Sequence, residues 1–571
     1  MRTSVRARLV PAIVVLGLAL AACGTQQQGS PSASGGSSAQ PSSDATGGTV
    51  RIGIGGAPDS LNPGIGELSE AYTLYELMYD TPISISNEGK YEPELAKSWE
   101  VSDDGLTWSV ELVDNATFHD GTPLTSEDVK FTLELYRDTE EFPYLSSYPD
   151  VFKKIDAPDA THLTIHLSSP VGNFEYRMAF MYVLPKHIWE NEDPTKFKNA
   201  EMIGSGPFKL IENKRGEFTR LGANTAYWNG PPHVDEVIFQ TIKNADARVA
   251  ALTNGDVDMI TEFPPTAVPT LQNAENVTTS ITDPVSGSLR DVFFNLVDPA
   301  DCPPKDADVP GKCTGHPALR DLAVRKALAM AVDKEQIISV AQLGLATPGL
   351  TLVPIGLGDF YASDVDDYAL DVDGANAALD AAGYKDTNGD GVRECLASQD
   401  CPTGDLTFRF FYPTDIDTGP READLLKGMW EAIGVKLQIQ GIDSDTLIPI
   451  CCPGFDYDII LWGWGSDPDP AFLLGVPLCS EVDTGFNETG YCNPSYDDLY
   501  DQQGVETDYS TRVGIIHQMQ KQLMDDVVYI VPYYQKQLQA YRSDRYTGWW
   551  AGATSWGLED PSSLAVIRPV Q

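Results

Sequence analysis

Positive charge and histidine are scarce in this sequence. It contains 39 Lys and Arg against 83 Asp and Glu, which gives a formal net charge of −44 at pH 7. Nucleic-acid binding needs clustered Lys and Arg to neutralise phosphates, so this balance argues strongly against a nucleic acid as partner. It also disfavours docking of the folded body on anionic lipid. Seven His in 571 residues leave little material for a metal centre or for general-base chemistry.

Short motifs of the common enzyme classes are also absent. The sequence has no Gly-x-Ser-x-Gly elbow, no His-Glu-x-x-His, no P-loop, and no Gly-x-Gly-x-x-Gly after an expected strand. His162 and His166 share one face of a strand expected at 161–167, but no acidic cluster accompanies them, which favours surface histidines over metal ligands. We therefore expect no enzymatic activity, with an extracellular hydrolase as the less favoured alternative.

Long apolar runs are limited to the N-terminus. Three Arg precede an apolar run at 9–22, which is shorter than a membrane-spanning helix and has the layout of a signal peptide. The run ends in Leu-Ala-Ala-Cys23, which resembles the bacterial lipobox, whose Cys is lipidated and becomes the first mature residue; an ordinary secretory signal is the alternative. Residues 24–48 lack large apolar side chains and predict a flexible linker. We expect an extracytoplasmic protein anchored to the cell membrane only by lipidated Cys23.

The other eight cysteines form an even number, as expected for disulfides in an exported chain. Cys451 and Cys452 are adjacent, so they either form a vicinal bridge or pair elsewhere. A metal site is the rival interpretation, but no Cys-x-x-Cys pair and no nearby histidine cluster supports it. Three pairs flank short polar inserts and predict loop-closing disulfides: Cys302 with Cys313, Cys395 with Cys401, and Cys479 with Cys492.

Strand and helix patterns alternate along the chain, which implies α/β lobes with mainly parallel sheets. A capping residue, Thr125 or Ser126, precedes one of the expected helices. Strands are expected at 49–54, 108–112, 161–167, 237–242, 292–296, 406–412, 435–440 and 457–462. Helices are expected at 71–79, 126–137, 245–254 and 421–433, and a long one is expected from about 317.

Six segments in fixed order together resemble the family 5 extracellular solute-binding proteins, the oligopeptide, dipeptide and nickel-binding group. The resemblance implies a two-lobed, periplasmic-binding-protein-like α/β fold of type II, in its larger form with an extra domain inserted in lobe 1. A solute cleft would lie between the lobes and close by hinge motion. The segments are YEPELAKSWEVSDDGLTWSVELVDNATFHDGTPLTSEDVKFTLE (91–134), GSGPFKL (204–210), AYWNGPPHVDEVIFQTIKNADARVAALTNGDVDM (226–259), HPALRDLAVRKALAMAVDKEQI (316–337), WGWGSDPDP (462–470) and YRSDRYTGWW (541–550).

The resemblance also implies domain limits and a function. A monomer would capture an oligo- or dipeptide and hand it to the permease of an ABC importer. The same fold binding a metal chelate, an oligosaccharide or another small molecule is the alternative. The expected limits are a signal peptide at 1–22, the lipidated Cys and linker at 23–48, lobe 1 at 49–85, 204–292 and 536–571, an inserted subdomain at 86–203, and lobe 2 at 293–535.

The strongest candidate for ligand binding is Asp467. In the family's peptide binders an Asp in a Trp-x-x-Asp context takes the ligand ammonium, and the matching pattern here runs from Trp464 to Asp467. Pro468 directly follows, which departs from the family pattern, so a shifted loop could let Asp469 serve instead. A simple Asp-Pro turn acid is the structural alternative. Trp462 and Trp464 share one face of a strand and either wall the ligand or pack in the core.

Five further residues are weaker candidates. Arg290 and Arg409 could pair with a ligand carboxylate, although a surface ion pair is the commoner fate of an Arg. Tyr412 ends a strand and could hydrogen bond to a ligand. Ser60 and Leu61 lie in the loop after the first strand, and such loops line clefts in α/β sheets.

One polar turn matches the opening of a calcium loop. Asp386, Asn388 and Asp390 have the right spacing, but position 12 is Ala397, where a bidentate Glu is expected. The pattern therefore favours a polar hairpin turn, with a structural calcium ion as the alternative. We expect no other cofactor.

Overall fold

The computed structural model describes residues 46–570, except for 87, 143–144, 304–310, 415, 483, 485, 551–553 and 556. Residues 44–571 form one compact unit. The expected signal peptide, Cys23 and almost all of the expected linker lie outside the described residues. None of the helices in the described part of the chain combines the length and apolar character that a membrane crossing requires.

The first large element is an eight-stranded mixed sheet, in the order β21-β12-β19-β11-β1-β10-β9-β8. Val50 and Ile52 of β1 are fully buried, as expected for a central strand that is covered on both faces. β1 pairs in parallel with β10 and β11. The strands are β1 (Thr49–Ile54), β8 (Phe208–Lys214), β9 (Phe218–Ala223), β10 (Glu236–Thr241), β11 (Met259–Ile260), β12 (Val277–Pro284), β19 (Gln537–Arg542) and β21 (Thr554–Ser555); the associated helices are α1 (Ser69–Met78), α5 (Ala245–Asn254), α6 (Val268–Gln272) and α15 (Pro561–Leu564).

A four-stranded antiparallel sheet, β4-β5-β7-β6, lies within the segment expected as the inserted subdomain. Its core is continuous with that of the eight-stranded sheet, because Trp108 and Val50 belong to one hydrophobic cluster. Thr125 and Asp128 form a capping box at the start of α2. The elements are β2 (Ile83–Ile85), β3 (Tyr91–Pro93), β4 (Ala96–Val101), β5 (Thr107–Leu112), α2 (Ser126–Asp138), β6 (Phe152–Asp159), β7 (His162–Leu167), α3 (Phe174–Ala179) and α4 (Lys186–Trp189). We call this region and the eight-stranded sheet lobe 1.

Lobe 2 is built on a six-stranded sheet, in the order β14-β18-β13-β17-β15-β16. Alternate residues of β13 enter two cores: Val292 faces the core covered by α7 to α10, and Phe293 faces the core covered by α11 to α14. The strands are β13 (Ser288–Phe294), β14 (Ala346–Pro348), β15 (Thr407–Pro413), β16 (Lys436–Ile442), β17 (Ile459–Gly465) and β18 (Tyr529–Gln535). The helices are α7 (Leu322–Met330), α8 (Lys334–Ala341), α9 (Val372–Ala382), α10 (Gly419–Glu431), α11 (Ser444–Cys451), α12 (Ala471–Gly475), α13 (Pro494–Val505) and α14 (Tyr509–Asp525).

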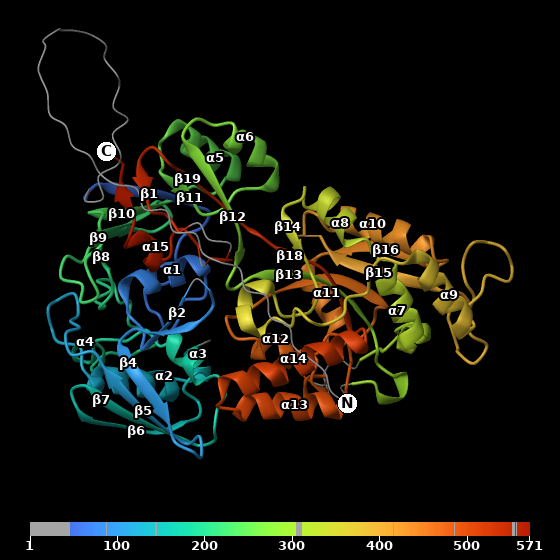
Figure 1. The fold of residues 1–571 in the computed structure, drawn as a ribbon, viewed down its shortest axis with the longest axis horizontal. Helices are drawn as coiled ribbons and strands as arrows, with labels where there is room; N and C mark the ends of the chain where they lie inside the picture. The colour runs from blue at the N-terminus through green and yellow to red at the C-terminus, as the bar shows by residue number, and fades with distance from the viewer. Residues whose placement is uncertain are drawn as a thin grey trace, which may run out of the picture. The chain divides into compact units, whose positions relative to one another are not determined.

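The chain passes twice between the two large sheets (Figure 1). Residues 285–287 join β12 to β13, and Lys536 joins β18 to β19. The Lys536 ammonium lies 3.0 Å from the Asp283 carboxylate, so an ion pair ties the second crossover to the end of β12, next to the first crossover. The boundary expected after residue 292 falls inside β13, which pairs with β17 over its whole length.

Two expectations about the elements are wrong. The large sheets are mixed rather than mainly parallel, since β13 pairs antiparallel with both β17 and β18. The long helix expected from 317 is instead a 3-10 turn at Pro317–Arg320, then α7 and α8. Asp321 and Asp333 cap the two helices through their side chains, which divides the apolar run into separate helices. A small sheet of β20 (Tyr546–Thr547) and β22 (Arg568–Pro569) completes the fold.

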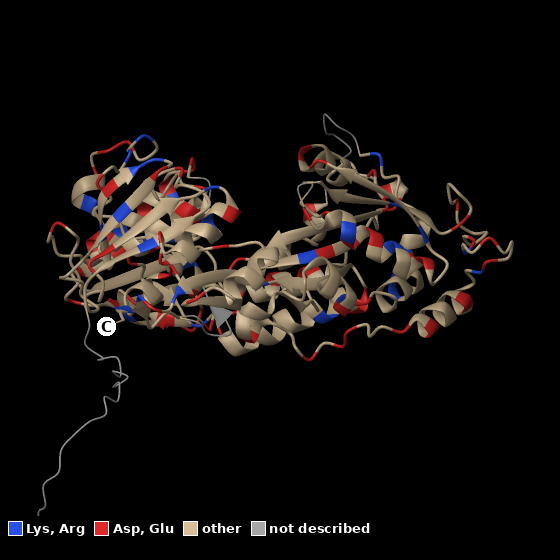
Figure 2. Ribbon diagram, turned by 90° about the horizontal axis from the view of Figure 1, so that it is seen from above, with Lys and Arg blue, Asp and Glu red and all other residues tan. Residues whose placement is uncertain are grey.

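Acidic residues are spread over the elements of both lobes and are not gathered in one segment (Figure 2). Many of the basic side chains pair with them; Lys97 with Glu111 and Arg220 with Glu236 are examples. The net charge is therefore a property of the whole solvated surface, which favours solubility.

Candidate functional site

The segment after β17 is held against the first crossover. Ser288 of β13 pairs with Gly465 of β17. The Ser466 N–H donates to the Gly287 carbonyl at 2.8 Å, and the Gly287 N–H donates to the Ser466 hydroxyl at 3.0 Å. Residues 466–469 of lobe 2 therefore lie where the chain passes between the lobes.

The loop after β1 reaches the same end of the lobe 1 sheet. β19 begins at Gln537, directly after the second crossover, and pairs antiparallel with β11. The carboxyl ends of β11 and of its parallel neighbour β1 therefore lie at the crossover end. Loops at the carboxyl ends of strands are the usual ligand-binding places in α/β sheets. Both lobes thus present such a loop at the crossovers.

Asp467 is a half-buried carboxylate, and no residue in the described part of the chain forms an ion pair with it. Burial raises its pKa above the ordinary value, and repulsion from Asp469 adds to the rise, although a hydrogen bond from the Tyr176 hydroxyl opposes it. An uncompensated carboxylate of this kind is suited to accept a charged donor from a ligand.

Tyr176, the hydrogen-bond partner of this carboxylate, belongs to a group of three aromatic side chains in lobe 1. Tyr176 in α3 approaches the Tyr148 hydroxyl at 3.2 Å, and Phe180 stacks on Tyr148 with ring centroids 5.7 Å apart. Phe180 also meets the edge of Tyr176. An aromatic wall beside a carboxylate favours a cationic group such as an ammonium. The sequence did not point to these residues, because they lie in the inserted segment, almost 300 positions before Asp467.

Asp469 already has a partner. Its two oxygens accept from the two terminal nitrogens of Arg512 at 2.7 and 2.8 Å, and both side chains are 1% exposed. Gln503 also accepts from Arg512. The charge of Asp469 is neutralised inside lobe 2, so the geometry favours Asp467 over Asp469 as the free carboxylate.

Trp462 and Trp464 pack on the core, and their role as a ligand wall stays a prediction. Both are half-buried on one face of β17 and pack on the core of lobe 2. The Trp464 indole N–H donates to Glu488 at 2.9 Å, and its ring meets the edges of Phe472 and Phe486. Phe472 is 39% exposed. The core thus orients the Trp464 ring and leaves part of this aromatic group accessible.

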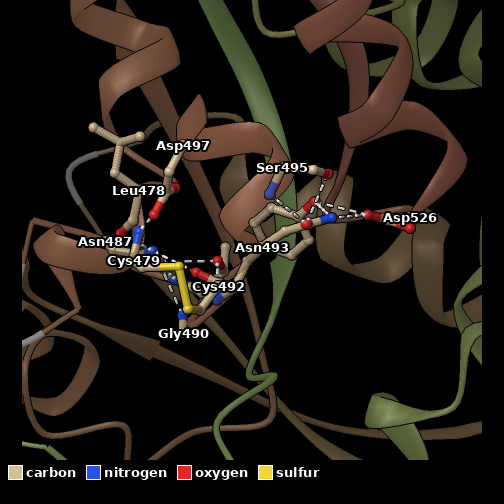
Figure 3. Close-up of a disulfide and its surroundings, with 11 residues drawn as sticks. Leu478, Cys479, Asn487, Gly490, Cys492, Asn493, Ser495, Asp497 and Asp526 are labelled. Atoms are coloured by element: carbon tan, nitrogen blue, oxygen red, sulfur yellow. Dashed lines mark hydrogen bonds between the residues drawn. A yellow bond between two sulfur atoms is a disulfide. The ribbon is translucent and has the colours of Figure 1, made fainter. Parts of the chain in front are cut away.

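The loop that carries Glu488 is closed by the disulfide between Cys479 and Cys492 (Figure 3). The Asn487 amide donates to the carbonyls of Leu478 at 3.0 Å and Tyr491 at 2.8 Å, so it spans the same loop from inside. Glu488 is almost fully buried, and burial raises its pKa well above the ordinary value.

The two candidate arginines are occupied by side chains of the protein itself. Arg290 is buried, lies 3.4 Å from Glu422 and donates to the Trp462 carbonyl at 3.0 Å. Arg409 pairs with Asp456 at 3.0 Å and Asp458 at 2.9 Å. These two carboxylates precede β17, whereas Asp467 follows it, so Arg409 lies roughly 20 Å from the crossover end of that strand.

The remaining candidates, Ser60, Leu61 and Tyr412, contact other parts of the protein. The Ser60 hydroxyl accepts from the Asn62 N–H at 3.0 Å, and the Leu61 carbonyl accepts from Asn199 at 2.8 Å. Tyr412 packs beside Gly419 and Gly441, where an added Cβ would lie 2.9 and 2.8 Å from its ring and hydroxyl. Ser60 and Leu61 therefore sit in a loop that is fixed at the crossover end of lobe 1.

In the turn from Asp386 to Asp390, side chains of the turn form hydrogen bonds with its own backbone N–H groups. Asp386 accepts from the N–H groups of Gly389 at 2.7 Å and Gly391 at 2.9 Å. Asn388 donates to Asp390 at 3.1 Å. These are the hydrogen bonds of a polar turn, and a structural calcium ion at this turn stays an untested alternative.

The structure pairs the eight cysteines as four disulfides. Cys451 and Cys452 form the vicinal bridge, the first of the two options that the sequence left open. His316 lies close to Cys395 and Cys401, a proximity that the sequence did not reveal. Its ring nitrogens contact the Asp405 carbonyl and the Ala318 N–H, which leaves them engaged. The other pairs are Cys302 with Cys313, Cys395 with Cys401, and Cys479 with Cys492.

Known proteins resemble this chain over nearly its whole length. The oligopeptide-binding protein AppA of Bacillus subtilis is 26% identical over 539 residues, which cover 92% of each chain. The solved structure of the ABC transporter substrate-binding protein CtaP of Listeria monocytogenes is 27% identical, with a TM-score of 0.74, and the match covers 90% of this chain and 99% of that one. NikZ of Campylobacter jejuni, solved with Ni(L-His), shares the fold at 22% identity and a TM-score of 0.69 over 92% and 99% of the two chains.

The family model for bacterial extracellular solute-binding proteins, family 5, matches residues 90–483. That span includes the inserted sheet, the first crossover and the segment from Trp464 to Asp469. The fold is accordingly the two-lobed α/β fold of the solved relatives. This chain belongs to family 5 of the bacterial extracellular solute-binding proteins.

Proposed function

We propose that this protein captures a peptide between its lobes and delivers it, as a monomer, to the permease of an ABC importer. The observation that carries the proposal is the uncompensated, half-buried carboxylate of Asp467, flanked by aromatic rings at the crossover end of lobe 2. A peptide offers an ammonium for such a group. AppA is named as an oligopeptide-binding protein and CtaP as a substrate-binding protein of an ABC transporter, which supports the same role here.

A ligand held by both lobes would stabilise a closed form. The lobes are joined by two short crossover segments, and a few residues of this kind can absorb the dihedral changes of hinge closure. A ligand shifts the balance between the open and closed forms only if it binds one form more tightly than the other. A ligand that contacts both lobes binds the closed form more tightly and therefore favours closure. The closed form then presents a surface that the open form lacks, and this difference is what a permease recognises.

The test begins with the ligand itself. Native mass spectrometry of the purified protein should reveal co-purified peptides. Recovery of sugars or metal chelates without any peptide would instead support the alternative suggested by the structural likeness to NikZ. Incubation with peptides should leave them intact, because the proposed role is capture and not cleavage.

Calorimetry on Asp467→Asn then tests the residue. Loss of a charged hydrogen bond is worth about 1.5–3 kcal/mol, so the affinity for pentaalanine should fall roughly 10- to 100-fold. N-acetylated pentaalanine should bind the wild type as weakly as pentaalanine binds the variant. Asp498→Asn, which removes an exposed charge from α13 of the same lobe, is the matched control. Unchanged affinity in Asp467→Asn would remove this residue from the site.

We also propose that Cys23 carries the lipid that tethers the protein. The supporting observations are the sequence Leu-Ala-Ala-Cys at the end of an apolar run and the acidic, solvated surface of the folded body, which has little attraction for anionic membranes. Labelling of cells with a clickable fatty acid should mark the wild type and not Cys23→Ser. Equal labelling of both proteins would place the anchor elsewhere.

A further inference from the structure

A cavity of about 220 Å³ opens in lobe 1, at the carboxyl ends of β1 and β11. Gln539, three residues after the second crossover, donates to Glu559 in its wall at 2.7 Å, so the cavity lies at the crossover end of the sheet. Pockets that enclose a whole drug-sized ligand occupy roughly 300–1,000 Å³. This cavity is therefore sized for one side chain of a larger ligand.

Its lining joins an apolar wall to carboxylates. Leu74 and Phe239 contribute apolar surface, and Glu70, Glu262 and Glu559 contribute carboxyl groups. A long basic side chain has the same two parts, an aliphatic stem and a charged end. The lining thus matches the chemistry of Lys or Arg along its length.

Only one of these three carboxylates has a cationic partner in the described part of the chain. Glu262 pairs with Arg248 at 2.7 Å. Glu559 accepts from the neutral amide of Gln539, and Glu70 accepts from the Ser69 hydroxyl at 3.3 Å. Glu70 and Glu559 therefore face the cavity without a cationic partner in the described part of the chain.

Two glycines allow the carboxylates to lie at the backbone of this loop. A Cβ on Gly56 would lie 1.8 Å from a Glu70 oxygen, and a Cβ on Gly55 would lie 2.5 Å from a Glu262 oxygen. Any larger residue would displace these oxygens. The close approach is thus built into the loop that follows β1.

The surroundings disfavour the charged form of two carboxyl groups when no cation is bound. Burial raises the pKa of Glu559 to about 7, and that of Glu76 on α1 to about 8, with further contributions from repulsion by Asp560. Burial of carboxyl groups without counter-charges is costly, and a bound cation relieves that cost.

We propose that this cavity receives the cationic side chain of a Lys or Arg in the bound peptide, which makes basic oligopeptides the ligand class. The inference rests on the proposed peptide-binding function. Asp467 in lobe 2 would hold the ligand ammonium, and the cavity in lobe 1 would hold the side chain. One ligand would then contact both lobes through two charged groups.

The experiment compares lysine with norleucine, its neutral near-isostere, at each position of pentaalanine in turn, by calorimetry. At one position the Lys peptide should bind at least tenfold more tightly than the norleucine peptide. In the double variant Glu70→Gln/Glu559→Gln this advantage should fall below threefold, while the affinity of the norleucine peptide stays within twofold. Glu100→Gln, an exposed acid of the inserted sheet, is the control and should preserve the advantage.

A second variant supplies the cation internally. Thr73 lines the cavity from α1, so Thr73→Lys should fill it with an ammonium and abolish the preference for Lys. Thermal unfolding confirms that each variant folds. The inference would be overturned if Lys and norleucine peptides bound equally at every position. It would also be overturned if the preference for Lys survived both in Glu70→Gln/Glu559→Gln and in Thr73→Lys. In either case the proposed peptide binding would still stand. Failure of every peptide to bind would overturn the proposed function itself.

Discussion

Asp291 is a fully buried carboxyl group on β13, opposite Trp462. Neither of its oxygens has a hydrogen-bond partner among the described residues. Burial raises its pKa to about 7, although Arg290 opposes the rise, and Asp291 in turn raises the pKa of Glu488. The folded protein therefore holds a proton here at pH values where the unfolded chain, with an Asp pKa of about 3.9, has released it.

This difference predicts that stability falls as pH rises. Between about pH 4 and pH 7 the folded state binds more protons than the unfolded state, so the free energy of unfolding decreases with pH; below and above this window the group has no further effect. Roughly 2–4 kcal/mol should be lost across the window. In Asp291→Asn the decrease should be smaller by that amount, measured by urea unfolding at pH 4.5, 6.0 and 7.5. Parallel pH profiles for both proteins would contradict the assignment.

The neighbouring acids Asp467 and Asp469 should respond in opposite ways to neutralisation. Asp469→Asn leaves the buried Arg512 without its counter-charge, so it should lower the free energy of unfolding by about 3–5 kcal/mol. Asp467→Asn should change stability little and ligand affinity strongly, because Asp467 has no ion-pair partner in the described chain. Urea unfolding and calorimetry on both variants separate the two roles. A stable Asp469→Asn protein with lost affinity would reverse the assignment.

At the scale of elements, the loop of residues 479–492 supports the aromatic group on β17. Its disulfide joins two cysteines that are 13 positions apart in the sequence. The Glu488 side chain in this loop accepts a hydrogen bond from Trp464 and so orients its ring. A loop of this length should reduce the entropy of the unfolded chain by an amount worth about 3 kcal/mol. The loop thus affects both stability and the geometry of the site.

The double variant Cys479→Ser/Cys492→Ser should therefore lose about 3 kcal/mol of unfolding free energy and several-fold affinity for pentaalanine. Cys395→Ser/Cys401→Ser is the matched control. Its cysteines are only 6 positions apart and lie near His316, which contacts Asp458 before the start of β17, whereas Trp464 lies near the other end of that strand. This variant should lose less stability and no affinity. Denaturant unfolding and calorimetry make the comparison. Equal affinity losses in the two double variants would show that Trp464 does not depend on the 479–492 loop.

Elements with local signals were predicted closely. The helix expected at 245–254 is α5 with the same limits, because Asn244 caps its first turn and Gly255 ends it with a φ of 80°. The first half of β13, Ser288–Asp291, carries no such local signal and was missed. It becomes a strand because β17 and β18 pair with it from both sides. The mixed direction of the sheets was mispredicted for the same reason.

At the scale of the whole molecule, lobe 1 contacts lobe 2 away from the crossovers. The Gly172 N–H of the inserted segment donates to the Gly504 carbonyl of α13 at 2.8 Å. A Cβ on Gly172 would lie 2.4 Å from the Gln503 carbonyl and 2.5 Å from the Glu506 carbonyl, whereas a Cβ on Gly504 would meet nothing within 4 Å. The contact therefore depends on glycine on one side only.

Gly172→Ala should separate the two backbones and weaken this contact between the lobes. We expect about a tenfold or greater loss of affinity for pentaalanine, equivalent to about 1.4 kcal/mol, and a larger radius of gyration of the ligand-saturated protein in small-angle X-ray scattering. Gly504→Ala, on the other side of the contact, should behave like the wild type. Unchanged affinity and radius in Gly172→Ala would show that closure does not use this contact.

The sequence by itself determined the properties that depend on composition and on neighbours along the chain: the acidic surface, the capped helices, the cysteine pairs around short inserts, and the family. Only the tertiary structure decided which charges are free. Arg512 neutralises Asp469 from 43 positions away, and Tyr176 reaches Asp467 from another lobe. Whether a carboxylate is free to bind a ligand depends on which distant groups the fold brings to it. The cavity between Glu70 and Glu559 likewise forms only when the fold brings distant residues together, so no local sequence pattern predicts it.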